Sequence, residues 1–366
     1  MANSDLNERL IKARYFFGKG DFRNAAQHCR QILAEDDKCL DAIILLGTIA
    51  KRTGAHARAV SVFEHALTLD ANSVGAHLGL GSALAAVGKW DRAASVYEKA
   101  IALDPKSADA RIGYGTAQIA TGDRAGALAS FEECLGVQPS NEAAAFMAAA
   151  LRGQGLPPNA RTIRTSFDRY AETFEGHLVD VLGYRMPFLM AQTLTIEHPS
   201  PFAAVLDLGC GTGLMGDSLS PDRATVIDGV DLAPRMIEVT RRKGRYGKLV
   251  AGDIVDYLRA CTPGSYDLVV SADVFIYVGP LEPVFSEVAR VLSAGSLFCF
   301  SVEHTATDDY EVQASSRYAH GVGYIDRLSK RFGYERVTSS LAPLRHENGS
   351  DIIGRLELLR RVIAPD

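Results

Sequence analysis

The sequence predicts a helical repeat domain followed by an α/β domain built on a mostly parallel sheet. A 34-residue repeat runs through the first part of the chain, from residue 6 to residue 141. After residue 200, short apolar segments alternate with helical segments, and a glycine-rich turn follows the first apolar segment. The length of 366 residues agrees with two domains, because a single hydrophobic core rarely grows so large.

The repeat predicts pairs of antiparallel helices. One phase carries a glycine that suits the end of a first helix, where a left-handed residue is favoured: Gly20, Gly54, Gly88 and Gly122. Five positions later an alanine allows the second helix to approach closely: Ala25, Ala59, Ala93 and Ala127. A third phase fills the space between the helices: Cys29, Phe63, Tyr97 and Phe131. This pattern resembles the tetratricopeptide repeat family over residues 6–141.

The resemblance implies an α-solenoid of four repeats, and residues 142–155 read as one further, capping helix. We therefore expect a repeat domain over 6–155 and a linker over 156–160, where Pro157 and Pro158 break the helix. Tetratricopeptide arrays usually recognise a protein or peptide in a concave groove, which would here draw on Ile43, His77 and Arg111. Two interpretations stay open: a protein partner in the groove, or a scaffold that forms a homodimer.

The remaining residues, 161–366, predict the α/β domain. Continuous apolar runs are typical of buried parallel strands, and they occur at 203–208, 225–231, 249–254, 266–272 and 296–301. Residues 353–359 predict a last, antiparallel edge strand. The first run leads directly into a glycine-rich turn and a helix, where a ligand can approach the backbone closely.

This turn carries the motif Asp-x-Gly-x-Gly-x-Gly, at Asp207, Gly209, Gly211 and Gly213. Acidic residues also end the second and third strands, at Asp231 and Asp253. The motif and the acids resemble class I methyltransferases, which are Rossmann-like and use S-adenosyl-L-methionine. The resemblance covers 161–366 and implies a seven-stranded, mostly parallel sheet, with S-adenosyl-L-homocysteine as the product.

By this resemblance the glycine turn passes under the methionine half of the cofactor, and Asp207 orients its amino group. Asp231 would hold the ribose, and Asp253 would accept a hydrogen bond from the adenine amino group. Tyr170 would close over the sulfonium, because a positive charge favours aromatic faces. The expected cofactor site comprises Asp207, Gly209, Cys210, Gly211, Gly213, Asp231, Leu232, Met236, Asp253, Ile254, Ser271 and Tyr170.

Segments 167–178 and 316–321, taken with the repeats, resemble a bacterial group of predicted methyltransferases that contain tetratricopeptide repeats. The resemblance implies transfer of a methyl group to a small-molecule, peptide or protein acceptor. An alternative stays open, in which a repeat scaffold keeps a methyltransferase fold that binds cofactor without turnover.

Four residues are candidates for the catalytic step: Asp273 and Tyr277 after the fourth strand, His304 after the fifth, and His320. We expect His320 to act as the general base from a mobile lid around 317–324, because a histidine titrates near neutral pH. The segment 271–277 lacks the Asx-Pro-Pro-aromatic turn of DNA amino-methylating enzymes, so nucleic acid is not the expected substrate.

Composition excludes several other classes. The net charge of −5 gives no general attraction to nucleic acid or an acidic membrane. No run approaches the ~18 apolar residues of a membrane span, and the start of the chain has no apolar signal-peptide core. The six cysteines show no metal-ligand spacing. The sequence therefore predicts a cytoplasmic protein without a metal site.

Overall fold

The computed structural model of the chain describes residues 2–153, 160–176, 178, 183–347 and 350–362. They form two compact units, Met1–Ala148 and Ala149–Asp366. Positions 156–159 of the predicted linker lie outside the described residues, so the domain boundary stays a prediction.

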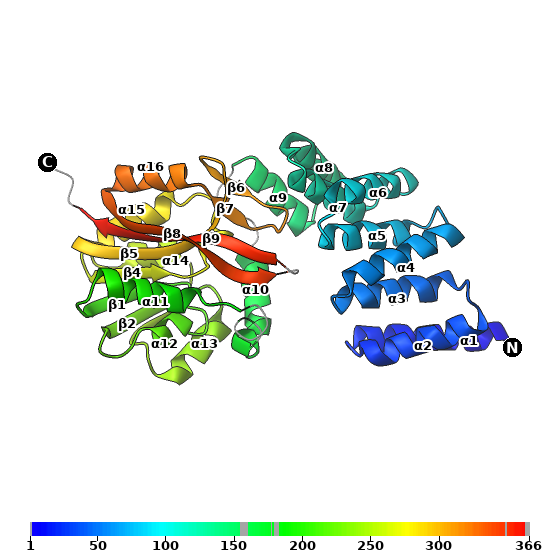
Figure 1. Ribbon diagram of the computed structural model, residues 1–366, viewed down its shortest axis with the longest axis horizontal. Helices are drawn as coiled ribbons and strands as arrows, with labels where there is room; N and C mark the ends of the chain where they lie inside the picture. Colours follow the sequence, from blue (N-terminus) through cyan, green and yellow to red (C-terminus); the bar gives the residue numbers. More distant parts are fainter. Residues whose placement is uncertain (1, 154–159, 177, 179–182, 348–349, 363–366) are drawn as a thin grey trace. The chain divides into compact units, whose positions relative to one another are not determined.

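The first unit is helical throughout its described length, and its helices follow one another in antiparallel pairs (Figure 1). The helices are α1 (Ala2–Gly18), α2 (Phe22–Glu35), α3 (Leu40–Arg52), α4 (His56–Leu69), α5 (Val74–Ala86), α6 (Trp90–Leu103), α7 (Ala108–Ala120) and α8 (Arg124–Val137). The expected capping helix is present as α9 (Glu142–Leu151).

The repeat positions pack as the sequence predicts. Each of the four alanines of the repeat is fully buried. The ring of Phe63 packs against the backbone of the next repeat, since a Cβ added at Gly79 would lie 2.2 Å from it. Gly113 makes the same room for Tyr97, where the distance would be 2.4 Å. The aromatic residue of one repeat thus depends on a glycine of the next.

The residues expected in the groove are placed differently. Ile43 and His77 are 4% and 6% exposed, and the Arg111 side chain is 11% exposed. His77 Nε2 lies 2.9 Å from the carbonyl oxygen of Ala71, in the turn between α4 and α5. The prediction that these positions line a recognition surface is therefore wrong for Ile43 and His77, because they fill the interior between helices.

The second unit is built on one sheet with the order β3-β2-β1-β4-β5-β7-β6, in which β9 also pairs with β5 and β8. The strands are β1 (Phe202–Leu208), β2 (Ala224–Asp231), β3 (Leu249–Ala251), β4 (Tyr266–Ser271), β5 (Leu292–His304), β6 (Tyr310–Val312), β7 (Tyr318–His320), β8 (Tyr334–Glu347) and β9 (Ser350–Arg361). Strands β1 to β5 pair in parallel, while β9 runs antiparallel to β5 and β8. The predicted mostly parallel sheet is confirmed.

Helices cover both faces of this sheet. On one face, α14 (Ile254–Ala260), α15 (Glu282–Val291) and α16 (Val322–Phe332) share a core with Leu206 and Phe298. On the other, α11 (Met186–Glu197) and α12 (Leu214–Ser218) pack with Val205 and Leu268. Because β1 is buried on both faces, its apolar residues form a continuous run rather than an alternating one.

Two further helices lie beside the carboxyl ends of the strands. The helix α13 (Pro234–Lys243) follows β2, and α10 (Ala160–Tyr170) packs against it. Phe167 of α10, Ala171 just after α10 and Met236 of α13 share one cluster. None of the helices in the described ranges is both long and apolar enough to cross a bilayer.

The described sheet has nine strands where seven were expected, and the C-terminal part differs most. Residues 353–359 were expected at the edge, but β9 lies between β5 and β8. Strand β8 was not expected, because its sequence YERVTSSLAPLRHE is largely polar and shows no apolar alternation. Part of the expected mobile lid at 317–324 is strand β7, which pairs with β5 and β6.

Candidate active site

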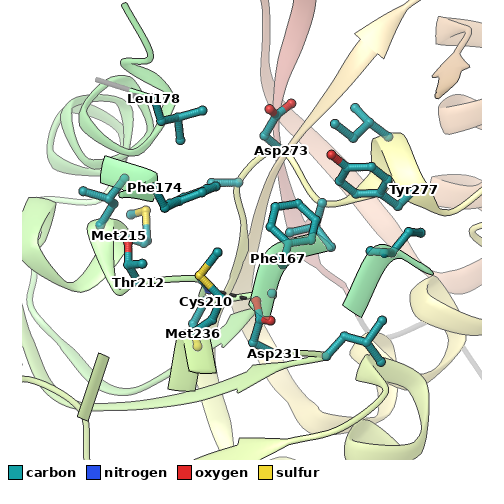
Figure 2. A pocket seen from close by; sticks show the side chains of 18 of the residues that line it. Phe167, Phe174, Leu178, Cys210, Thr212, Met215, Asp231, Met236, Asp273 and Tyr277 are labelled. Atoms are coloured by element: carbon teal, nitrogen blue, oxygen red, sulfur yellow. Dashed lines mark hydrogen bonds between the residues drawn. The ribbon is translucent and has the colours of Figure 1, made fainter. Parts of the chain in front are cut away.

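A cavity of about 440 Å³ opens at the carboxyl ends of β1, β2 and β4. This is the edge where parallel α/β sheets bind their ligands, and the volume is typical of a small-molecule site. Figure 2 shows side chains around the cavity, with Asp231 toward one end and Asp273 toward the other.

The glycine-rich turn forms one wall of the cavity. Gly209, Gly211 and Gly213 have φ angles of +71°, +53° and +89°, which other residues rarely adopt. A Cβ at Gly211 would meet only the ring of Phe174, at 4.0 Å, so it would extend into the open cavity. The Thr240 hydroxyl fixes this turn by donating to the Gly211 carbonyl oxygen at 2.6 Å.

Asp231 connects this turn to the end of β2. Its Oδ2 accepts from the Gly211 amide at 2.9 Å, and its Oδ1 accepts from the Ala233 amide at 2.8 Å. Burial raises the pKa of Asp231, while the two amides oppose that shift. Since each carboxylate oxygen has two acceptor sites, Asp231 can still accept hydrogen bonds from a ligand.

Asp207, at the end of β1, is 1% exposed and lines the cavity. The Tyr246 hydroxyl donates to its Oδ2 at 2.6 Å and accepts from the Gly216 amide at 3.0 Å. Burial raises the pKa of Asp207 to about 7, although the bond from Tyr246 opposes the shift and the nearby Asp231 adds to it. A carboxylate held in this way can receive a cationic group.

The wall beyond Asp231 combines apolar side chains with another acid. Leu232, Met236 and Ile254 line it. Asp253 caps α14, where its Oδ1 accepts from the amides of Val255 and Asp256. Within the part of the chain that the structure describes, Oδ2 of Asp253 has no hydrogen-bond partner, so it is available to a donor in the cavity.

Aromatic side chains from α10 and the turn after it cover the cavity. Phe167, Tyr170 and Phe174 line it and contact one another edge to face. Phe167 also contacts the ring of Tyr277, with centroids 5.7 Å apart. The Arg235 amide at the start of α13 donates to Asp168 of α10 at 3.0 Å, so this hydrogen bond links the two helices.

The opposite end of the cavity is a charged network around Arg345. This guanidinium is 3% exposed and donates from Nη1 to both oxygens of Asp273, at 3.1 and 3.0 Å. It also contacts Glu303 through Nη2 and Glu347 through Nε. Burial raises the pKa of Asp273 and of Glu303, and Arg345 opposes both shifts.

Asp273 adopts a left-handed backbone conformation with a φ of +59°, and its amide donates to the Ser301 hydroxyl at 2.8 Å. Residues other than glycine hold this conformation at a cost in free energy, and such strain concentrates at functional sites. The structure thus places Asp273 and Tyr277, two of the four catalytic candidates, on the cavity wall.

The two histidines do not line the cavity. His320 is fully buried, its Nε2 lies 2.9 Å from the Gly279 carbonyl oxygen, and its ring stacks on Tyr324. Burial lowers the pKa of His320 to about 4. This placement argues against the expected general base, because His320 lies in a paired strand rather than in a mobile lid. His304, the last residue of β5, is paired with His320, and burial and Arg355 lower its pKa.

Two expected cofactor residues also lie off the wall. Gly213 is the N-cap residue of α12, where the glycine-rich turn ends. Ser271 is fully buried and donates to the Leu208 carbonyl oxygen at 3.1 Å, so it joins β4 to β1. The other ten expected cofactor residues line the cavity.

Sequence reasoning missed Tyr246, Arg317, Arg345 and Glu347 as site residues. Tyr246 lies in the basic segment 241–248, which reads from sequence as a solvated helix end. Arg317 lies in segment 316–321, which carries the family resemblance, but no local spacing relates Arg317 or Arg345 to Asp273. Groups of residues that could hold a metal ion are absent from the described ranges, and no cysteine of the chain is in a disulfide.

Comparisons with known proteins identify both kinds of domain in this chain. Residues 206–300 match the model of a methyltransferase domain, and residues 12–74 and 84–151 match tetratricopeptide repeat models. The human methyltransferase-like protein 27 is 34% identical over 97 residues, which are 26% of this chain and 39% of that protein. The ubiquinone biosynthesis O-methyltransferase of Xylella fastidiosa is 32% identical over 155 residues, 39% of this chain and 61% of that protein.

The corresponding enzyme of Ralstonia nicotianae is 28% identical over 183 residues, covering 44% of this chain and 74% of its own length. The chain thus spans between two fifths and three quarters of the length of these relatives. Among solved structures, the N-methyltransferase NodS from Bradyrhizobium japonicum WM9 in complex with S-adenosyl-l-homocysteine is 20% identical, with a TM-score of 0.43; the match covers 54% of this chain and 97% of NodS. The chain therefore combines tetratricopeptide repeats with a methyltransferase domain.

Proposed function

We propose that this protein transfers a methyl group from S-adenosylmethionine to a small-molecule, peptide or protein acceptor, and that the repeats bring or orient a partner. The observation that carries the proposal is the glycine turn whose Gly211 amide is fixed by Asp231 beside an open cavity. A backbone that leaves this space, next to buried acids, suits a nucleoside-type cofactor.

The residues present fit S-adenosylmethionine. The open space at Gly211 suits its methionine half, and Asp207 suits its amino group. Asp231 retains acceptor capacity for ribose hydroxyls. The unpartnered Oδ2 of Asp253 suits the adenine amino group, with Leu232 and Met236 against the ring.

When bound, the cofactor supplies an electrophilic methyl group. The protein then has to align the acceptor, exclude water and take up a proton where the acceptor carries one. The aromatic side chains of Phe167, Tyr170 and Phe174 cover the cavity and so exclude water from it. Asp273 is the cavity carboxylate placed to take the proton, and burial raises the pKa of Tyr277, so its phenol stays protonated and can donate.

A cofactor-binding scaffold without turnover is the alternative. Asp207 is buried and Asp231 and Asp273 are partly buried, and removing a carboxylate from water costs free energy. The first two serve the cofactor in either case, but Asp273, with its left-handed backbone, lies at the other end of the cavity. Its placement favours a catalytic role.

The first test is binding of S-adenosylmethionine to the full chain. We expect Asp231→Ala to weaken binding by about 1.5–3 kcal/mol, because it removes hydrogen bonds to a charged group. Isothermal titration calorimetry measures the change, and Asp222→Ala, which removes an exposed acid in the turn before β2, should leave the affinity unchanged. Equal affinity in wild type and Asp231→Ala would contradict the proposed cofactor site.

Cofactor binding should also depend on pH. The pKa of Asp207 is raised to about 7, and the ionised form is the one that attracts the cationic cofactor. Protonation below that pKa therefore opposes binding, and affinity should be about tenfold lower near pH 6 than near pH 8. Titrations of Asp207→Asn provide the control: its affinity should be lower and nearly independent of pH. A wild-type profile as flat as that of the variant would refute the role of Asp207.

The repeats are expected to act separately from the cofactor site. A fragment starting near Asn159 should fold and bind S-adenosylmethionine with the affinity of the full chain, because residues 149–366 form a compact unit of their own. Turnover of the fragment on the physiological acceptor should be lower if the repeats recruit that acceptor. Full turnover would instead favour a scaffold or homodimer role for the repeats.

A further inference from the structure

The charged end of the cavity restricts which acceptors it can hold. Each of the three guanidinium nitrogens of Arg345 already contacts a carboxylate: Nη1 contacts Asp273, Nη2 contacts Glu303, and Nε contacts Glu347. With 3% exposure, this guanidinium has no free edge for a further anion.

Arg317 is the other cation on this wall. Its Nη1 donates to Glu347 Oε2 at 2.7 Å, and its Nη2 lies 3.4 Å from Glu347 Oε1. Burial would raise the pKa of Glu347, but the bonds and charge of Arg317 outweigh it and lower that pKa. Glu347 is therefore ionised and occupies the guanidinium edge that an anionic acceptor would need.

The network has more carboxylates than cations. Among its described side chains, Asp273, Glu303 and Glu347 surround only Arg317 and Arg345. The three carboxylates thus share two guanidinium groups, so the network holds more acids than cations in a partly buried place, where charge interactions are stronger than in water. An acceptor with a carboxylate or phosphate would be repelled here, whereas a cation would complete the balance.

The walls beside Asp273 are apolar and largely aromatic. Phe167 and Tyr277 lie between Asp273 and Asp231 (Figure 2). Ile163 and Tyr184 also line the cavity. These side chains suit a hydrophobic body, and the two rings suit an adjacent ammonium group.

From the charge excess and the aromatic walls, we propose that the acceptor is a primary or secondary alkylamine with an apolar body, whose ammonium group pairs with Asp273. The inference rests on the proposed methyltransferase function. The Asp273 carboxylate takes one proton from the ammonium group, which frees the nitrogen lone pair. A nitrogen–carbon bond to the methyl group then forms while the carbon–sulfur bond breaks, so the product is a methylated ammonium ion and neutral S-adenosylhomocysteine.

The test compares probes of similar size on the full chain saturated with S-adenosylhomocysteine. Calorimetry measures the affinities of 2-phenylethylamine, 2-phenylethanol, 4-ethylphenol and phenylacetate under identical conditions. We expect the amine to bind at least about tenfold more tightly than each of the others. Equal or tighter binding of the alcohol, the phenol or the acid, including failure of all four to bind, overturns the inference.

Variants assign the preference to this wall. Asp273→Asn should reduce the advantage of the amine to within about threefold while the affinity for S-adenosylhomocysteine stays unchanged, since asparagine tolerates a left-handed backbone. Glu347→Gln offers a second variant, with Glu335→Gln on the exposed side of the same strand β8 as its matched control. An amine preference that survives both cavity variants overturns the assignment. Failure of the proposed function would give a different result: S-adenosylhomocysteine itself would not bind when it is titrated into the full chain before the probes.

Discussion

Replacing Gly211 with valine is expected to abolish S-adenosylmethionine binding, with a loss of affinity of more than about 100-fold, or roughly 3 kcal/mol. Two effects act together. The φ of +53° is unfavourable for a β-branched residue, and the new side chain would extend into the cavity, where a Cβ meets no atom closer than 4.0 Å. Calorimetric titration of the folded variant measures the loss.

A valine at a second glycine, Gly264, is the control that distinguishes the effect of backbone strain from the effect of filling the cavity. Gly264 has a similar φ of +65°, and the nearest atom to its Cβ position is the Ser293 hydroxyl at 3.5 Å, away from the cavity wall. Gly264→Val should therefore lower thermal stability while the affinity for the cofactor stays at the wild-type value. If Gly211→Val bound the cofactor as tightly as Gly264→Val does, the glycine turn would not be the binding site.

Local patterns made most of the fold predictable. The 34-residue period relates residues that pack within one repeat or with the next, as Phe63 and Gly79 do, so neighbours in sequence determine the contacts. The same holds for β1, whose apolar run feeds directly into the glycine turn. Strand β8 was not predictable, because it is largely polar without apolar alternation and its pairing partner β9 carries the apolar pattern.

The cofactor side of the site followed from the rule that acids after parallel strands meet at one edge of a sheet. That rule correctly brought Asp207, Asp231 and Asp253 to one cavity. It does not extend to Tyr246, because the bond to Asp207 joins residues 39 positions apart and depends on how the segment after α13 folds back.

The acceptor side depends on contacts that are still more distant in sequence. Arg345 and Asp273 are 72 positions apart, and only the pairing of β8 with β9, and of β9 with β5, brings them together. His320 illustrates the opposite error. Its glycine neighbour and polar surroundings favoured a mobile loop, but its pairing with β5 and β6 buries the ring.

The same buried network predicts a large effect on stability. We expect Arg345→Met to lower the free energy of unfolding of the methyltransferase unit by about 3–5 kcal/mol, since it leaves Asp273 and Glu303 buried without their cation. Arg259→Met is the matched control. Arg259 forms an ion pair with Asp256 in which both side chains are at least 60% exposed, so its loss should cost less than about 1 kcal/mol.

The single tryptophan, Trp90, lies in α6 of the repeats, so its fluorescence follows the repeat unit during denaturation. Hydrogen exchange at β5 and β8 follows the methyltransferase unit. Arg345→Met should lower the protection from hydrogen exchange at β5 and β8 and leave the denaturation curve of the Trp90 fluorescence unchanged. If Arg345→Met lowered the protection at β5 and β8 less than Arg259→Met does, the buried carboxylates would not need Arg345 for their stability.

The loss of unfolding free energy in Arg345→Met should become smaller as the pH falls. Without Arg345, the folded-state pKa values of Asp273 and Glu303 rise further above their unfolded values, because the cation that opposed the effect of burial is gone. A carboxyl group with a raised folded pKa destabilises the fold at high pH, and this penalty fades as the pH falls through the folded pKa toward the unfolded one. The difference in unfolding free energy between wild type and Arg345→Met should therefore narrow between about pH 8 and about pH 5. A difference that stays constant with pH would mean that the arginine stabilises the unit through packing of its side chain, not by compensating buried carboxylates.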